Sequence, residues 1–450
     1  MEAALLGVLG VLVIAVGIAA SIALHEVGHL VPAKRSGVKC TQYMIGFGPT
    51  VWSRRRGETE YGVKAVPLGG YVRMLGMFPP KPGEPAREDS TGRLGLLVDQ
   101  ARRDAQREIG PEDADRLFYQ RSVPRRIVIM LGGPVMNLVI AVVLFTLLLT
   151  VWGIDQRKTL VDEVSACVVP MSATSTTPPT SCTGFPKTPA NAAGILPGDR
   201  IVSFAGQEIT AWSTLQTLIR TNPNQTLPLV VERDGARVPL TVTLVQDNRP
   251  KLDKWGNEVL DDQGARVLVP VGFLGVTPTV VREPLPLLQV PGQIGQFLEQ
   301  TASVVVRVPQ KMVGVVKAAT GQGKRDPNGP ISVVGVGRIA SEIGSAHGTA
   351  DNPISLADKF AGWIGLVASI NLALFVFNLV PLLPLDGGHV AGALWEGLRR
   401  TVARLFNRPD PGPVDIAKLL PLTYAVASLL LVMSALLIYA DIVNPVRLTG

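Results

Sequence analysis

The chain has 450 residues, of which 43 are Lys or Arg and 36 are Asp or Glu, so its formal net charge is +7. Only 18% of the residues are charged, against roughly 25% in an ordinary soluble domain. Four runs contain no charged residue, and each is long enough to cross the roughly 30 Å hydrocarbon core of a bilayer as a helix. A wholly soluble protein is therefore excluded. The uncharged runs are residues 3–24, 127–152, 361–385 and 419–440.

The first apolar segment ends in a pattern typical of zinc sites. Residues 1–33 predict the first transmembrane helix, whose inner end carries the HExxH motif His25-Glu26-Val27-Gly28-His29. Residues i and i+4 share one face of a helix, so both imidazoles can bind one Zn²⁺, while Glu26 can take a proton from a water at the metal. Ionisable residues within a spanning helix are costly, which favours a functional site over a simple helix end.

Two stretches separate this motif from the second apolar run. Residues 34–77 contain short β-prone runs divided by glycine and proline, which predicts hairpins close to the membrane. Residues 78–126 form an insertion, and its part 78–118 is rich in Pro, Arg and acidic residues, which predicts partial disorder. Residues 127–152 predict the second transmembrane helix.

The large link that follows contains a predicted small domain. Residues 153–189 predict a linker, and Cys167 and Cys182 lie in it on one side of the membrane, where a disulfide can persist; two free thiols are the alternative. Residues 190–280 alternate turns and strand-like runs. Residues 281–360 predict an extracytoplasmic amphipathic helix, at 288–319, and a loop.

The third apolar run leads into a second polar motif. Residues 361–385 predict the third transmembrane helix, and Leu385-Asp386-Gly387-Gly388-His389 follows it directly. Pro381 and Pro384 interrupt the run, which is tolerated in a membrane only where the segment lines a protein or water cavity. Residues 386–418 predict a cytoplasmic link, and residues 419–440 predict the fourth transmembrane helix.

A third zinc ligand has to come from outside the HExxH motif. Catalytic zinc usually takes three protein ligands and keeps one position for water. Asp386 is the best acidic candidate because the interrupted helix places it at the same depth as the two histidines of the motif. His389 and His347 are the other histidines of the chain, and we expect His389 to be a supporting or interfacial residue.

The distribution of Lys and Arg predicts the orientation in the membrane. Residues 34–126 hold 18 of them in 93 positions, whereas residues 153–360 hold 19 in 208. Because positive residues favour the cytoplasmic side, the first and third links are predicted to be cytoplasmic, and both termini extracytoplasmic. The active site then faces the cytoplasm. This asymmetry accounts for the net charge and suits an anionic lipid surface, so no nucleic acid partner is expected.

The paired motifs resemble a known family. HEVGH in the first span, together with Asn378 and the LDGGH motif of a later one, closely resembles the site-2 protease family of intramembrane zinc metalloproteases, in its bacterial, PDZ-containing, peptidase M50-like form. The resemblance implies that His25, His29 and Asp386 bind one Zn²⁺ per chain, that Glu26 is the catalytic acid and base, and that Asn378 helps to hold the substrate.

The resemblance extends to three further regions. Residues 132–137 look like the family's second-span motif, residues 46–72 like its membrane-associated β segment, and residues 190–278 like its extracytoplasmic PDZ domain. A PDZ groove binds peptides by strand addition, although a plain structural cap is the alternative. The further substrate-binding candidates are Asn137, Gly46, Gly48, Gly69 and Gly70, and the predicted groove strand is Gly272, Phe273, Leu274 and Gly275.

These observations predict an α-helical polytopic membrane protein with four transmembrane helices, a membrane-associated β-hairpin segment and an extracytoplasmic PDZ-like α+β domain. The predicted function is a zinc-dependent endoprotease of the bacterial plasma membrane that cleaves transmembrane helices of single-pass proteins. The resemblance implies substrates such as anti-sigma factors or remnant signal peptides, and an upstream site-1-type protease. The alternative is a non-catalytic zinc-binding membrane scaffold that recruits partners through the PDZ module.

Overall fold

The computed structural model describes residues 2–79, 100, 103, 105–169, 182–254, 256, 258–259, 266–321, 325–326, 329–348 and 353–446. Residues 80–99 of the predicted insertion lie outside this part. The chain divides into two compact units. The first, called here the helical unit, comprises residues 1–148 and 288–450, and the second unit comprises residues 149–287.

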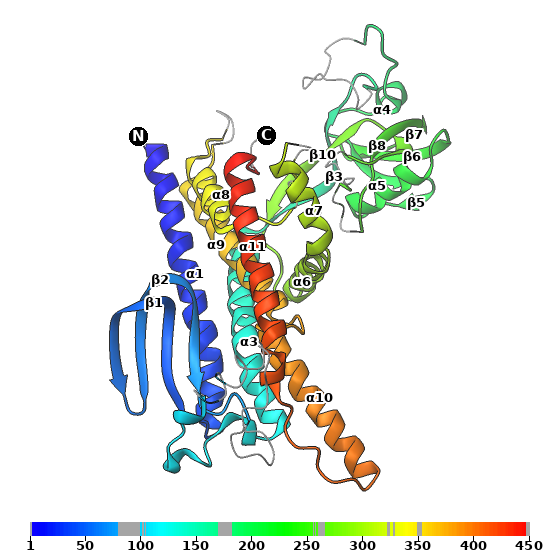
Figure 1. The fold of residues 1–450 in the computed structure, drawn as a ribbon. Coiled ribbons are helices and arrows are strands. Elements are labelled where there is room, and N and C mark those ends of the chain that lie inside the picture. The colour runs from blue at the N-terminus through cyan, green and yellow to red at the C-terminus, as the bar shows by residue number, and fades with distance from the viewer. Residues whose placement is uncertain are drawn as a thin grey trace. The chain divides into compact units, whose positions relative to one another are not determined.

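Four helices of the described chain are long and apolar enough to cross a membrane, which confirms the predicted number of apolar helices. Within the helical unit, α1 packs against α3, and α3 packs against α9 (Figure 1). The four segments are α1 (Glu2–Arg35), α3 (Val123–Leu147) with the π-helical turn Leu148–Trp152, α9 (Leu356–Asn378), and α11 (Leu420–Val443) with the preceding turn Ile416–Leu419.

The backbones of α1 and α3 approach each other through glycine. A Cβ atom on Gly28 would collide with the carbonyl of Gly132, and a Cβ atom on Gly132 would collide with the carbonyl of Gly28. Small residues permit this kind of close contact between membrane helices. The approach brings the histidine-bearing turn of α1 directly against α3.

The third spanning helix ends before the predicted span 361–385 does. Helix α9 ends at Asn378, because Pro381 and Pro384 lack the amide hydrogens that a continuing helix needs. A new helix, α10 (Asp386–Leu405), begins at the LDGGH motif, in a link for which no helix was predicted. It packs against α3.

The membrane-associated β segment is a two-stranded sheet whose strands fold back on themselves. β1 (Cys40–Arg56) pairs with β2 (Thr59–Met74) so that Gln42 lies opposite both Glu60 and Arg73. Gly46 and Gly69 have φ angles of +92° and +98°, a backbone region that favours glycine, and they lie where the strands bend. The sheet packs beside α1 (Figure 1).

Three more helices of the helical unit lie among the described residues. The amphipathic helix predicted at 288–319 is in fact two helices divided at Arg307, because Pro309 cannot continue the hydrogen bonding of the first. The second of these packs on α11 through Met312 and Val315. The three helices are α6 (Val290–Val306), α7 (Val308–Ala319) and α8 (Val333–Ser345).

The second unit has a sheet in the order β10-β3-β4-β6-β7, with β5 paired to β4, and a separate β8–β9 ribbon. Its core includes Ile201, Phe204, Leu215 and Val231. The elements are β3 (Ile154–Val164), α4 (Pro189–Ala193), β4 (Arg200–Phe204), β5 (Gln207–Glu208), α5 (Trp212–Thr221), β6 (Thr226–Arg233), β7 (Ala236–Thr243), β8 (Val245–Pro250), β9 (Leu268–Phe273) and β10 (Val276–Glu283).

Two features of this unit differ from the predictions. The stretch 153–189 is not simply a linker, because β3 pairs with β10 and β4 and so belongs to the sheet. The predicted groove strand at 272–275 is not one strand: Gly272 and Phe273 end β9, Leu274 is buried in the core, and Gly275, with a φ of +90°, turns the chain into β10. Cys167 and Cys182 form a disulfide with a Cα–Cα distance of 5.5 Å.

Candidate zinc centre and active site

Three side chains from two distant parts of the sequence meet inside the helical unit. His25 and His29 lie one turn apart on α1, and their Nε2 atoms are 3.2 Å apart. Asp386, the first residue of α10, places its Oδ2 atom 3.3 Å from Nε2 of His25 and 3.4 Å from Nε2 of His29. Among the described residues this is the one group of His, Cys, Asp or Glu arranged to hold a metal ion.

The donor set fits zinc in both chemistry and spacing. Two imidazole nitrogens and a carboxylate oxygen are ordinary zinc ligands, and zinc bonds of about 2.0–2.1 Å in a tetrahedron place the ligand atoms about 3.3 Å apart. The three observed separations lie close to that value. Space beside the ligand atoms depends on Gly133 of α3, since a Cβ atom there would lie 2.7 Å from Nε2 of His25 and would collide with Nε2 of His29.

Helix α3 also contacts the opposite side of both imidazole rings. Nδ1 of His29 lies 2.8 Å from the carbonyl oxygen of Ile129. Nδ1 of His25 lies 3.1 Å from the side-chain amide of Asn137. Each ring is therefore fixed by two contacts, one toward the ligand cluster and one toward α3, which is the arrangement that orients metal-binding histidines.

The remaining predicted residues have different surroundings. Glu26 is buried, and a Cβ atom built on Gly70 of β2 would lie 2.9 Å from its Cγ atom, so the edge of the sheet reaches the motif. Gly69 instead faces the ring of Phe47. Asn378 is half-buried at the end of α9. A Cβ atom on Gly46 would meet the carbonyls of Lys64 and Val66, and one on Gly48 would meet only the Val66 side chain.

The other two histidines are not part of the cluster. The metal-binding group of the described residues contains neither His389 nor His347. His389 lies in the first turn of α10, and its buried Nδ1 atom has no hydrogen-bond partner among the described residues. His347 follows α8.

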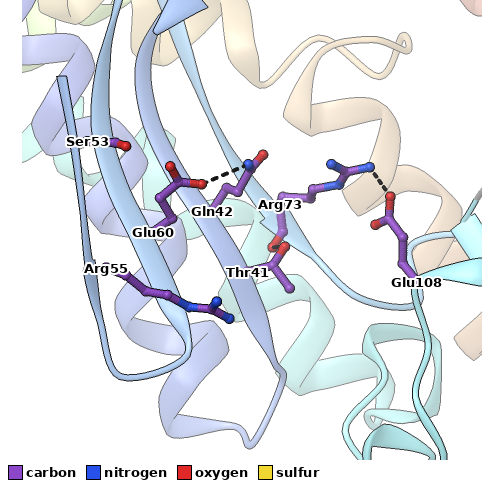
Figure 2. Close-up of a pocket in the computed structure, with 7 residues that line it drawn as sticks. All are labelled: Thr41, Gln42, Ser53, Arg55, Glu60, Arg73 and Glu108. Carbon is purple, nitrogen blue, oxygen red and sulfur yellow. Dashed lines mark hydrogen bonds and ion pairs between the residues drawn. The ribbon is translucent and has the colours of Figure 1, made fainter. Parts of the chain in front are cut away.

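A polar pocket lies on the β1–β2 sheet (Figure 2), and no histidine lines it. Its volume is about 590 Å³, and its carboxylates already have partners: Glu60 accepts a hydrogen bond from Gln42 at 3.2 Å, and Glu108 forms an ion pair with Arg73. It therefore offers no second acidic metal site. The lining residues are Thr41, Gln42, Ser53, Arg55, Glu60, Arg73 and Glu108.

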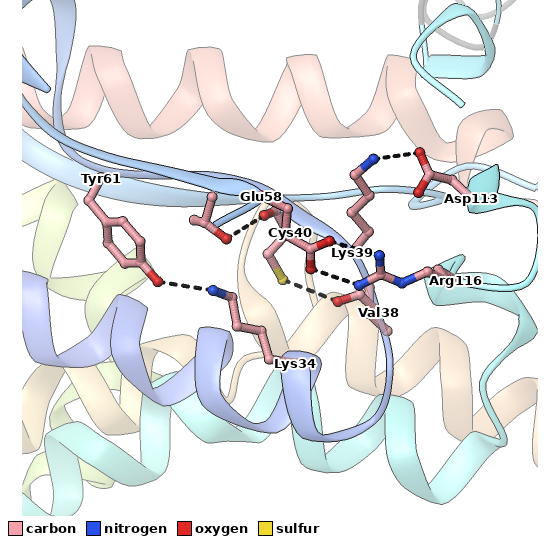
Figure 3. A network of polar contacts seen from close by, with 9 residues as sticks. Lys34, Val38, Lys39, Cys40, Glu58, Tyr61, Asp113 and Arg116 are labelled. Atoms are coloured by element: carbon pink, nitrogen blue, oxygen red, sulfur yellow. Dashed lines mark hydrogen bonds and ion pairs between the residues drawn. The ribbon is translucent and has the colours of Figure 1, made fainter. Parts of the chain in front are cut away.

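A polar network ties the same sheet to α1 and to the segment before α3 (Figure 3). Arg116 donates two hydrogen bonds of 2.7 Å to Glu58, which hold the pKa of the Glu58 carboxyl below its usual range. Lys39 pairs with Asp113 at 2.7 Å, and Lys34 at the end of α1 donates to the Tyr61 hydroxyl at 2.9 Å. The Lys34–Tyr61 bond joins the sheet to the helix that carries the motif, and the other contacts join the sheet to the segment before α3.

Sequence reasoning found the three converging side chains and missed part of their surroundings. Gly133 was noticed only as part of a motif, although a glycine pair followed by proline inside an apolar span is a signal of close helix contact. The role of Ile129 is carried by its backbone carbonyl, so no side-chain pattern reveals it.

Comparisons with known proteins agree with this geometry. A family model described as peptidase family M50 matches residues 13–408. The zinc metalloprotease Rip1 of Mycobacterium tuberculosis is 33% identical over 445 residues, which cover 98% of this chain and 99% of the relative. The regulator of sigma-E protease RseP of Escherichia coli is 26% identical over 452 residues, with coverages of 82% and 86%. The zinc metalloprotease RasP of Geobacillus kaustophilus is 26% identical over 425 residues, with coverages of 83% and 86%. This chain therefore belongs to peptidase family M50, the site-2 protease family of zinc metalloproteases.

Proposed function

We propose that this zinc metalloprotease cleaves transmembrane helices of single-pass membrane proteins, and that His25, His29 and Asp386 hold its zinc. The observation that carries the proposal is the convergence of these three ligands inside the helical unit, on a spanning helix and at the start of α10. A cluster of ionisable groups among apolar helices costs free energy, so its presence indicates a function.

In the proposed reaction, peptide-bond hydrolysis, the zinc ion and Glu26 have separate roles. Zinc, when bound, supplies the Lewis acidity that activates a water molecule and polarises a peptide carbonyl. Glu26 lies between the two histidines in sequence and is buried, so its carboxylate can take the proton of the attacking water without competition from bulk solvent. The same carboxyl group then returns the proton to the leaving amine. This assignment favours an enzyme over a non-catalytic scaffold.

The sheet edge can present the substrate. A transmembrane helix hides its amides in its own hydrogen bonds, so it must unwind locally before attack. The segment at Gly70 lies next to Glu26, and its partner Ile45 occupies only one of its two sides. We propose that an unwound substrate pairs with the free side as an added strand. Gly46, Gly48 and Gly69 have positive φ angles in this sheet, and we propose that Asn378, at the end of α9, contacts the released amides.

The membrane orientation and the substrates are proposed from the distribution of Lys and Arg and from the names of the relatives. We propose that both termini are extracytoplasmic and that the active site faces the cytoplasm. The second unit is proposed to be a PDZ-like module that binds peptides or excludes large ectodomains. Because one relative is named a regulator of sigma-E protease, we propose anti-sigma factors, first cut by a site-1-type protease, as substrates, with remnant signal peptides as a second group.

The test compares wild type with Glu26→Gln in the full chain, reconstituted with a single-span substrate and zinc. We expect cleavage to fall by about 10²–10⁴-fold, the usual contribution of a general base, while zinc stays bound. Glu112→Gln, at an exposed carboxyl before α3, is the matched control and should cleave normally. Undiminished cleavage by Glu26→Gln would contradict the proposed mechanism. Membrane proteomics of the two strains should then show which single-span fragments accumulate in the mutant.

A further inference from the structure

We propose that Asn137 is a positioning residue for the zinc ligand His25, and that it acts by accepting a hydrogen bond from Nδ1–H of His25 through its side-chain oxygen. The inference rests on the proposed assignment of His25 as a zinc ligand. It gives Asn137 a role in zinc binding in place of a contact with the substrate.

The first step concerns the surroundings of the amide. Asn137 is 1% exposed on α3, and its Nδ2 atom lies 3.1 Å from Nδ1 of His25. Its Oδ1 atom is buried, and no donor among the described residues reaches it. The oxygen and nitrogen of an amide are nearly identical in size, so turning the group by 180° exchanges them without new contacts.

The second step concerns the imidazole. Nε2 of His25 points to His29 and Asp386, toward the metal position. A neutral imidazole that offers its Nε2 lone pair carries its proton on Nδ1, and that N–H needs an acceptor. Turning the amide of Asn137 supplies this acceptor. The same turn pairs the Oδ1 atom with Nδ1–H of His25 and moves the NH2 group to the position that Oδ1 occupied.

The second histidine of the same site already has such an acceptor on α3. Nδ1 of His29 lies 2.8 Å from the carbonyl oxygen of Ile129, and a carbonyl can only accept, so His29 must carry its proton on Nδ1. Ile129 and Asn137 belong to the same helix, α3. Each zinc-binding histidine is then oriented by one acceptor from α3, and outer contacts of this kind fix the ring and raise its basicity.

The two roles considered for Asn137 require opposite chemistry. A residue that binds the carbonyl of an unwound substrate must donate, whereas a residue that orients His25 must accept. Aspartate keeps the acceptor and loses the donor. Leucine has nearly the same shape and has neither. These two substitutions therefore separate the roles.

The experiment measures the Zn²⁺ affinity of the full-length, detergent-solubilised protein by competition with a chromophoric chelator. Asn137→Leu should bind Zn²⁺ about 10–100-fold more weakly, the usual effect of losing an outer contact. Asn137→Asp should stay within about threefold of wild type or bind more tightly, because a carboxylate is a stronger acceptor. The matched control is Asn371→Leu, since Asn371 is fully buried in α9 and its side-chain amide donates to the Ser21 hydroxyl and to the Val367 carbonyl. It should keep wild-type affinity.

Three outcomes would overturn the proposal. One is wild-type Zn²⁺ affinity in Asn137→Leu, and another is an equal loss in Asn137→Asp and Asn137→Leu, which would mean that the donor matters. The third is an equal loss in Asn371→Leu, which would indicate a general effect of helix packing. His25→Ala measured beside them distinguishes the underlying assignment: if it keeps wild-type affinity, the proposed zinc ligands are wrong, whatever Asn137 does.

Discussion

Substitution of Gly133 by alanine tests whether α3 forms one wall of the zinc centre. A Cβ atom at this position would lie 2.7 Å from Nε2 of His25 and still closer to Nε2 of His29. Since non-bonded carbon contacts are optimal at about 3.5–4.0 Å, Nε2 of His25 would have to move by roughly 0.8 Å or more, and Nε2 of His29 by more than that. Zinc sites tolerate deviations of only about 0.2 Å in their bond lengths. We therefore expect Gly133→Ala to weaken zinc binding by about 100-fold or more.

The matched control is Gly365→Ala in α9, where the added Cβ atom would have one neighbour, the Leu148 side chain at 3.8 Å. Both substitutions gain roughly 1 kcal/mol of helix propensity, so propensity cannot explain a difference between them. Zinc affinity is measured by chelator competition, and the melting temperature of each purified variant reports its folding. If Gly133→Ala binds zinc like wild type, the Gly133 backbone does not border the metal position, and the geometric argument fails.

Two further predictions concern charged pairs. Glu396→Gln and Asp441→Asn each remove one member of a buried ion pair. Each substitution should lower the free energy of unfolding by about 3–5 kcal/mol. Only Glu396→Gln should also weaken zinc binding, because Glu396 holds in place the helix that begins with Asp386. In the second unit, burial raises the pKa of Asp199, but the hydrogen bonds from Arg233, the hydrogen bond from the Leu196 amide and the charge of Arg233 together outweigh it and hold that pKa below its usual range. The Asp199 carboxylate therefore stabilises the unit above about pH 4, and this stabilisation is lost as the pH falls. In wild type, cleavage of this unit by an added protease should increase as the pH is lowered, and this increase should be smaller in Asp199→Asn.

The spans and the ligands were predictable because they follow from short-range rules. Absence of charge over about 20 residues marks a span, and a spacing of four places His25 and His29 on one face of a helix. Asp386 could be placed near them because Pro381 and Pro384 stop a helix at a known depth. The structure confirms four apolar helices and brings the three side chains together.

Other features depend on partners that are distant in sequence. Helix α10 was missed because its run of arginines hides an amphipathic pattern with Glu396 on the buried side. Strand β3 was taken for a linker because its partners, β10 and β4, lie elsewhere in the chain. Gly133 matters only because α1 carries histidines opposite it. In each case the local sequence permits the observed structure, and the packing partner selects it.

The two groups of α3 that contact the zinc ligands, the Ile129 carbonyl and the Asn137 amide, are uncharged for a physical reason. The zinc position is lined by Asp386, with Glu26 buried beside it, so two carboxylates already balance the charge of one Zn²⁺. A carboxylate on α3 would leave a net negative charge among apolar helices, which is expensive. A backbone carbonyl at Ile129 and an amide at Asn137 can accept the same hydrogen bonds without adding charge. Asn137→Asp should therefore keep zinc while lowering the melting temperature, and equal stability would refute this account of the charge balance.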